Sequence, residues 1–443
     1  MGAQRRHGFT VYFQIECERS IAKELNEHFS FDVPGAKFMP SFKNRLWDGK
    51  IRLFDIRNNQ IYVGLSDYIY KFATAKKYTI SGGIRTQLEI DVDSVQSFVD
   101  SLKSTVKIRD YQFNAVQHSI RNGRCILVSP TASGKSFIIY VLIRYYQQII
   151  DNSHILLLVP RSSLVEQMYT DFQDYGWDSE KYCHRIYAGK DKTSPKLVHI
   201  STWQSIYQLP KKHFDKYKVI LGDEVHTFTA KSLKTIMQKT TDCPNKFGLT
   251  GTLDDAESHH LVLEGLFGSV KKVTTTKQLI DAKQISDLKI MGIVLTYSEK
   301  ECIIRDYNEE IKFITEHPQR NNLIRNLSID LKGNTLILFS LIKHGELLHE
   351  LVKEKADVNR KTFFVYGGTD SETREKIRGI VESERDSIVV ASFGVFSTGI
   401  NIRNLHNIIF ASPYKSRIRN LQSIGRGLRT HESKAGAKLY DIA

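Results

Sequence analysis

Residues 129–136, SPTASGKS, separate a short apolar run, RCILV, from a longer segment, SFIIYVLIRYYQQII, whose apolar residues recur at helical spacing. A strand, a glycine loop and a helix in this order bind phosphate in parallel α/β domains. Gly134 allows the tight turn, Lys135 can reach the β and γ phosphates, and the Ser136 hydroxyl can bind magnesium. Ser129 stands where the usual loop has glycine. The stretch still predicts a parallel-sheet domain that binds a nucleotide.

Two adjacent acids follow about 90 residues later, at the end of the apolar run in YKVILGDEVH. Asp223 at the carboxyl end of a buried strand suits magnesium coordination, and Glu224 suits activation of a water molecule. Taken alone, the pair could equally be solvated residues or helix caps. Together with the loop, it indicates a site that hydrolyses a nucleotide.

The composition limits the class of protein. A chain of 443 residues with 41% hydrophobic content can bury two or three cores. Its formal net charge of +14 favours a polyanionic partner, nucleic acid before membrane, although a merely basic enzyme has the same charge. Five scattered cysteines without a C-x-x-C pair argue against a zinc site or a disulfide framework. No apolar run approaches the ~20 residues of a membrane span. We expect a cytoplasmic protein that is not secreted.

The order of motifs over roughly residues 105–440 resembles that of superfamily 2 helicases. IRDYQFNAV is similar to their adenine-recognising motif, and the loop carries their T-x-S-G-K-[ST] core. The resemblance implies ATP and Mg²⁺ as cofactors, with Ser136 and Asp223 on the metal. It implies nucleotide contacts from the residues Arg109, Gln112, Thr131, Ser133, Gly134, Lys135 and Ser136.

Three further motifs of the first half match this family. LLLVPRSSLVEQ and ISTWQSI are similar to motifs that touch the DNA strand, and GLTGTL is similar to the motif that couples hydrolysis to domain movement. The implied DNA contacts are Pro160, Arg161, Ser162, Thr202 and Trp203. The implied coupling residues are His226, Thr250 and Thr252.

The second half continues the resemblance in TLILFS, VVASFGVFSTGINI and LQSIGRGLR. The implied DNA contacts are Phe339, Ser340, Ser392 and Thr398, and Gly399 is implied at the nucleotide. Gln422, Arg426 and Arg429 are implied as catalytic, with the two arginines reaching the γ-phosphate when two domains close. One departure is Asn401, where many relatives have an acid.

The first 100 residues read as a strand and an amphipathic helix, then a hairpin turning at Asn58 and Asn59, then another helix. Between them, KFMPSFKNRLWDGKIRLFD mixes cations with aromatic residues, which can bind phosphates and stack on bases. The predicted DNA contacts are Lys43, Arg45, Trp47 and Lys50. The competing interpretation is that Phe38 and Trp47 are core residues and the lysines a solvated rim. The string WDGKIRL, with KFGLTGTL and ASFGVFSTGI downstream, resembles phage branch-migration helicases.

The sequence therefore predicts an α/β protein with two tandem RecA-like parallel-sheet domains and a small N-terminal α+β domain. We expect the N-terminal DNA-binding domain at 1–100, the ATP-binding RecA-like domain at 101–282 and the second at 283–443. The resemblance implies an ATP-dependent DNA helicase that unwinds and branch-migrates forks and Holliday junctions, 3′ to 5′. We expect a monomer, because one chain supplies both faces of the ATP site. Its partners would be branched, single-stranded and duplex DNA, with no membrane; protein partners are not identified. The alternatives are an RNA helicase or duplex-DNA translocase of the same fold, and a non-catalytic DNA-binding scaffold.

Overall fold

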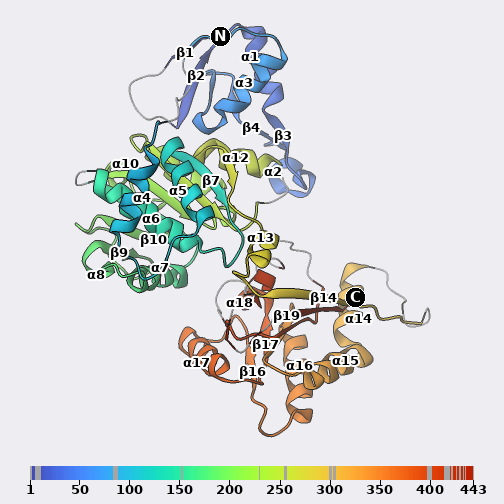
Figure 1. The fold of residues 1–443 in the computed structure, drawn as a ribbon. Coiled ribbons are helices and arrows are strands. Elements are labelled where there is room, and N and C mark those ends of the chain that lie inside the picture. Colours follow the sequence, from blue (N-terminus) through green and yellow to red (C-terminus); the bar gives the residue numbers. More distant parts are fainter. Residues whose placement is uncertain are drawn as a thin grey trace. The chain divides into compact units, whose positions relative to one another are not determined.

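The computed structural model describes most of the chain in two compact units (Figure 1). The described residues are 2–4, 11–82, 88–150, 153–228, 230–253, 257–298, 302, 306–396, 402–413, 420, 423–425, 427–428, 431–432, 434 and 436–442. Unit 1 comprises Met1–Pro130 and Gly134–Thr274, and unit 2 comprises Thr131–Ser133 and Thr275–Ala443. The N-terminal module thus shares one unit with the first parallel-sheet domain.

The N-terminal module is a small antiparallel sheet with helices beside it. Its four-stranded sheet has the order β1-β2-β6-β5, and β3 and β4 form a separate two-stranded ribbon. The predicted hairpin is confirmed, because β5 and β6 pair antiparallel and Asn59 in the turn has a φ of 49°. The elements are β1 (Gly2–Gln4), β2 (Tyr12–Glu16), α1 (Arg19–His28), β3 (Ser30–Asp32), η1 (Ala36–Phe38), α2 (Pro40–Lys43), β4 (Lys50–Arg52), β5 (Phe54–Asp55), β6 (Gln60–Tyr62), η2 (Val63–Leu65) and α3 (Ser66–Ala75).

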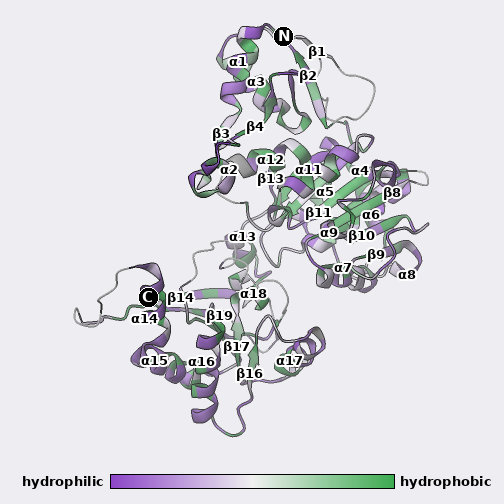
Figure 2. Cartoon of the chain, turned by 180° about the vertical axis from the view of Figure 1, so that it is seen from behind, coloured by the Kyte–Doolittle hydropathy of each residue, from purple (hydrophilic) through white to green (hydrophobic). Residues whose placement is uncertain are grey.

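A seven-stranded parallel sheet with the order β13-β7-β12-β11-β8-β10-β9 forms the rest of unit 1. Its central strands are apolar and buried, as expected when helices cover both faces. In Figure 2 these strands are green, whereas the outer helices α7 and α8 carry purple. The elements are α4 (Val92–Ser101), α5 (Asp110–Asn122), β7 (Arg124–Val128), α6 (Lys135–Ile149), β8 (His154–Val159), α7 (Ser162–Asp174), α8 (Ser179–Tyr182), β9 (Cys183–Ile186), β10 (Val198–Thr202), α9 (Trp203–Ile206), α10 (Lys211–Phe214), β11 (Tyr217–Asp223), η3 (Val225–Thr227), α11 (Ala230–Lys239), β12 (Asn245–Thr250), α12 (Glu257–Phe267) and β13 (Val270–Lys272).

Unit 2 is built on a six-stranded parallel sheet with the order β14-β19-β18-β15-β17-β16. The elements are α13 (Thr276–Asp281), β14 (Asp287–Ile293), α14 (Tyr307–Glu316), α15 (Pro318–Asp330), β15 (Thr335–Phe339), α16 (Ile342–Lys355), β16 (Thr362–Val365), α17 (Ser371–Ser383), β17 (Ile388–Ser392), α18 (Phe393–Phe396), β18 (Asn407–Phe410) and β19 (Gly436–Ile442). Two parallel-sheet domains and a small N-terminal α+β module confirm the predicted fold class. No helix in the described ranges is long and apolar enough to cross a membrane.

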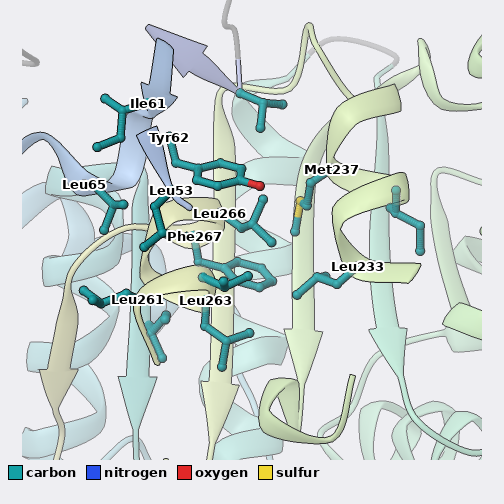
Figure 3. Packing of buried hydrophobic residues seen from close by; sticks show 14 of the residues in the cluster. Leu53, Ile61, Tyr62, Leu65, Leu233, Met237, Leu261, Leu263, Leu266 and Phe267 are labelled. Carbon is teal, nitrogen blue, oxygen red and sulfur yellow. The ribbon is translucent and has the colours of Figure 1, made fainter. Parts of the chain in front are cut away.

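One hydrophobic core runs from the N-terminal module into the first parallel-sheet domain (Figure 3). Side chains of the module lie directly against helix α12, and residues of α11 flank them. The module contributes Leu53, Ile61, Tyr62 and Leu65; α12 contributes Leu261, Leu263, Leu266 and Phe267; α11 contributes Leu233 and Met237. The module is therefore packed onto the domain rather than tethered to it by a linker.

Two glycines allow the backbones of the module and α12 to approach closely. A Cβ at Gly64 would lie 1.9 Å from the carbonyl oxygen of Glu264, and one at Gly265 would lie 2.8 Å from the Cβ of Tyr62. Beside them, the Tyr68 hydroxyl donates to the Glu264 carboxylate at 3.0 Å. The joint therefore has no space for even one added methyl group.

We predict that Gly64→Ala destabilises unit 1. The added methyl meets backbone rather than a movable side chain, and such overpacking costs about 1–3 kcal/mol. Thermal unfolding followed by circular dichroism should show a melting temperature several degrees lower. Gly379→Ala on α17, where the added methyl meets nothing within 4 Å, is the matched control and should melt like the parent or slightly higher. Equal melting of Gly64→Ala and the parent would refute tight packing at the joint.

Candidate functional site

The predicted phosphate loop connects the end of β7 to the start of α6. Gly134, the residue before the helix, has a φ of 78°, and a Cβ there would lie only 2.4 Å from the Gln112 Nε2. The left-handed conformation therefore favours glycine, and an added Cβ would also displace the Gln112 amide. The helix that follows is 15 residues long, so its first backbone N–H groups and its dipole favour an anion at this end.

Ser129 replaces the first glycine of the usual loop without backbone strain. It is fully buried, and it is absent from the residues with positive φ in the described chain. Its backbone N–H donates to the Thr250 carbonyl at 2.9 Å, and its carbonyl accepts from the Lys135 Nζ at 3.2 Å. The loop is thus held to the end of β12 at a position where a side chain fits.

Lys135 brings the loop together with the acidic pair. Its ammonium group lies 3.8 Å from the Glu224 Oε1, and both side chains are mostly buried. β11 and β12 are neighbours in the sheet, and β12 also pairs with β7. The carboxyl ends of these parallel strands meet at one edge, which is where ligands bind in such folds.

Asp223 ends β11 in an almost fully buried position, with 4% of its surface exposed. Burial raises the pKa of its carboxyl group, the neighbouring Glu224 raises it further, and Lys135 partly offsets both effects. The Asp223 Oδ1 has no hydrogen-bond partner within the described part of the chain. A buried oxygen of this kind is suited to accept a cation or a water molecule bound to one.

The predicted metal residues fit magnesium. Ser136 is the second residue of α6, and its hydroxyl lies 2.8 Å from the Tyr175 hydroxyl. Magnesium bound with a nucleotide needs one or two protein oxygens, since phosphates and waters complete its shell. Among the described residues there is no cluster of three or more His, Cys, Asp or Glu side chains that could hold a metal. Asp223 and Ser136 therefore suit a nucleotide-borne ion better than a metal bound by protein alone.

Glu224 is connected to the end of the next strand through His226. Glu224 has a φ of 49°, a left-handed conformation that is costly for a non-glycine residue. The His226 Nδ1 lies 3.4 Å from the Glu224 Oε2 and 2.6 Å from the Thr250 Oγ1. Thr250 in turn donates to the Thr252 carbonyl at 2.7 Å. The three predicted coupling residues thus form one continuous network with the predicted base.

The predicted adenine motif begins helix α5. The Gln112 Oε1 accepts from the Arg109 backbone N–H at 2.9 Å, and the Arg109 Nη1 donates to the Tyr111 hydroxyl at 2.8 Å. Gln112 is buried, and its Nε2 lies 3.4 Å from the Gly134 carbonyl. The motif is therefore fixed against the phosphate loop. Thr131 and Ser133 occupy the loop itself, between β7 and α6.

The predicted strand contacts of unit 1 lie at the same carboxyl edge. Pro160 follows β8, Arg161 is the cap residue of α7 and Ser162 is its first residue. Thr202 ends β10, the neighbour of β8, and Trp203 begins α9. Gln204, which the sequence analysis did not single out, joins the two segments by donating to the Pro160 carbonyl at 3.1 Å.

In unit 2, β15 and β17 pair side by side, with Phe339 opposite Ser392. The Phe339 ring is fully buried and stacks on Phe364 at 5.5 Å, so its side chain belongs to the core. Ser340, the next residue, is exposed, and its backbone N–H donates to the Ser412 hydroxyl at 3.3 Å. The remaining predicted residues of this half, Thr398, Gly399, Asn401, Gln422, Arg426 and Arg429, lie outside the described residues.

The four predicted DNA contacts of the N-terminal module differ in their surroundings. Lys43 and Arg45 are exposed. Trp47 is half-buried, and its Nε1 donates to the Lys50 carbonyl at 2.8 Å, while the Lys50 ammonium lies 4.0 Å from Asp32. Lys43 and Arg45 thus face solvent, whereas Trp47 and Lys50 hold the loop in shape.

Three family models match consecutive parts of the chain. Residues 6–82 match the N-terminal domain of the DNA helicase UvsW. Residues 105–255 match the res subunit of type III restriction enzymes, and residues 319–431 match the conserved C-terminal domain of helicases.

Whole-chain comparisons agree with these matches. The chain is 36% identical over 453 residues to the ATP-dependent DNA helicase uvsW of Enterobacteria phage T4, covering 98% of this chain and 89% of the relative. It is 24% identical over 416 residues to the DNA 3′-5′ translocase XPB2 of Sulfurisphaera tokodaii, covering 83% and 88%. The crystal structure of T4 UvsW matches with a TM-score of 0.57 and 34% identity, covering 100% of this chain and 90% of that chain. This chain therefore belongs to the UvsW family of superfamily 2 and is an ATP-hydrolysing DNA helicase.

Proposed function

We propose that this DNA helicase remodels branched DNA, namely replication forks and four-way junctions, and moves 3′ to 5′ along the strand it tracks. The observation that carries the proposal is the N-terminal module, which matches the UvsW N-terminal domain and presents exposed cations while sharing a core with the first motor domain. A module packed in this way can hold duplex DNA beside the motor. The proposed direction follows that of the relative from Sulfurisphaera tokodaii, a DNA 3′-5′ translocase.

In the proposed reaction Lys135 neutralises the β and γ phosphates, and Glu224 accepts a proton from the attacking water. Their separation of 3.8 Å leaves both at the edge where the triphosphate would lie. Ser136 and Asp223 would hold magnesium, which would supply positive charge to the phosphate oxygens. Arg109 and Gln112 orient the adenine, and Gln422, Arg426, Arg429 and Gly399 complete the site from the second motor domain. One chain supplies both motor domains, which supports a monomeric motor.

The proposed DNA path follows the carboxyl edges of the two parallel sheets. In unit 1 it contacts the segments after β8 and β10, through Pro160, Arg161, Ser162, Thr202 and Trp203. In unit 2 it contacts Ser340, Ser392 and Thr398. We leave the buried Phe339 ring out of the path, because a fully buried side chain cannot reach a base.

We predict that Lys135→Ala abolishes processing of a mobile four-way junction. Without the ammonium group, DNA-stimulated ATP hydrolysis should fall at least about 100-fold, as for other residues that stabilise transferred phosphate. The measurement is ATP-dependent conversion of the junction beside a tailed duplex, resolved on native gels. Lys192→Ala, which changes an exposed lysine away from the loop, is the matched control and should keep full activity. Junction conversion by Lys135→Ala at the parental rate would refute the assigned site.

The same experiment tests a second function, translocation on duplex DNA without strand separation. The similarity to a DNA 3′-5′ translocase favours this candidate. DNA-stimulated ATP hydrolysis by the parent protein with neither junction conversion nor unwinding would support it over branch migration.

We further predict that His226→Ala separates ATP hydrolysis from DNA movement. His226 connects Glu224 to Thr250 and lies in η3, outside the phosphate loop, so its loss should leave nucleotide binding within about twofold. The length of duplex separated per ATP hydrolysed should fall by about tenfold, because the buried hydrogen bond between His226 and Thr250 is lost. Binding of a fluorescent ATP analogue, phosphate release and unwinding should be measured in parallel. Thr250→Ser keeps the hydroxyl partner and serves as the control. Unchanged strand separation per ATP in His226→Ala would contradict the coupling role.

A further inference from the structure

We propose that residues 36–47, here called the tip lobe, form a wedge at the DNA branch point, where the Phe38 ring stacks on a base and the Leu46 side chain makes apolar contact with the neighbouring base. The tip lobe comprises η1, α2, the residue Met39 between them and the four residues after α2. The proposal rests on the proposed action on branched DNA, and it names the residues that separate the strands there. Phe38 belongs to the segment whose aromatic residues, judged from the sequence, can stack on bases, whereas the sequence assigns no role to Leu46.

The tip lobe exposes large apolar side chains that the fold leaves unburied. Phe38 is 70% exposed and Leu46 is 81% exposed, and Met39 and Phe42 beside them are partly exposed. Every residue from Lys37 to Leu46 is exposed except Ser41, which is half-buried. Several exposed apolar residues within one short segment are typical of an interaction site, because each forfeits the free energy that burial would give.

The charges of the tip lobe select the partner. Within the described part of the chain, no carboxylate lies within ion-pair distance of Lys37, Lys43 or Arg45, and the Lys37 Nζ lies 5.4 Å from the centre of the Phe38 ring. The acids of this region, Asp32 and Asp48, instead pair with Lys50 and Arg52 at the base of the lobe. The tip therefore combines apolar surface with unpaired positive charge. A DNA branch offers the complementary pair, exposed base faces beside phosphates.

The base of the tip lobe is held firmly enough for a wedge. The Leu46 backbone N–H donates to the Ser41 carbonyl at 2.9 Å. Gly49 has a φ of 81°, and a Cβ there would lie 3.1 Å from the Phe42 ring, so this glycine closes the loop against that ring. Trp47 braces the same turn through its bond to Lys50.

The tip lobe is attached to the core of unit 1, so it can transmit force from the first motor domain. The lobe connects strands β3 and β4, and Phe31 and Ile51 of these strands pack against the core that the module shares with α12. Movement of the first motor domain along DNA therefore carries the tip with it. A wedge on a flexible tether would yield instead of separating base pairs.

The test is the double variant Phe38→Ala with Leu46→Ala, compared with the parent protein on a mobile four-way junction that carries 2-aminopurine at the branch. Loss of the Phe38 ring and the Leu46 side chain should lower the rate of junction conversion about 10-fold or more, since aromatic stacking alone contributes about 1–3 kcal/mol per base. The rise in 2-aminopurine fluorescence on binding should also be lost. Single-stranded DNA should still stimulate ATP hydrolysis within about twofold, because the tip lobe lies outside the nucleotide site. Val358→Ala changes a fully exposed apolar residue of unit 2 and should match the parent.

The outcomes separate the wedge from the function on which it rests. If the parent converts the junction and the double variant does so equally well, with the same fluorescence rise, the wedge is refuted while branch migration stands. If the parent itself leaves the junction intact while hydrolysing ATP, the proposed function is refuted and the wedge with it. If the double variant also loses ATP hydrolysis stimulated by single-stranded DNA, the lobe is a general DNA-binding surface and the wedge is refuted. Loss of conversion and of the fluorescence rise in Phe38→Ala, with both retained in Phe38→Tyr, would support stacking.

Discussion

The first motor domain depends on the burial of its parallel strands from end to end. Strands such as β8 and β11 are largely apolar and buried, so an unpaired polar side chain would be costly within the sheet and the polar motifs lie where the strands end. The loop after β7, the acidic pair at the end of β11 and the threonine that ends β12 all lie at that one edge. Pairing of β7, β12 and β11 as neighbours then brings the three motifs within hydrogen-bonding distance. The candidate nucleotide site is a direct result of sheet order.

Glu224 in the acidic motif connects the candidate nucleotide site with the end of β12. Glu224 adopts a left-handed backbone, which turns the chain sharply after β11. This turn places His226 between the Glu224 carboxylate and the Thr250 hydroxyl. A change in what Glu224 contacts can therefore alter the end of β12 through a single imidazole. The strain at Glu224 is consistent with a residue fixed for chemistry rather than for stability.

The features predicted from sequence were those whose signal is local. The strand, glycine loop and helix around Lys135, and the hairpin at Asn59, each lie within about 30 residues, and periodicity and turn residues identify such units. The joint between Gly64 and Gly265 could not be predicted, because the two glycines are far apart in the chain and neither has a side chain to mark the contact. Trp47 also carried an ambiguous signal. An aromatic residue among cations is expected both on a surface that stacks on bases and in a loop that it stabilises. The hydrogen bond from Trp47 to the Lys50 carbonyl shows that Trp47 stabilises its loop.

The shared core also restricts how this protein can vary over evolution. The apolar side chains of α12 are covered by residues of the N-terminal module, so the first motor domain without that module would expose a hydrophobic surface to water. Exchange of the module for an unrelated DNA-binding domain would require simultaneous replacement of the α12 surface. Residues near position 60 and residues near position 265 are therefore expected to change together, and the module and the motor to be inherited as one unit.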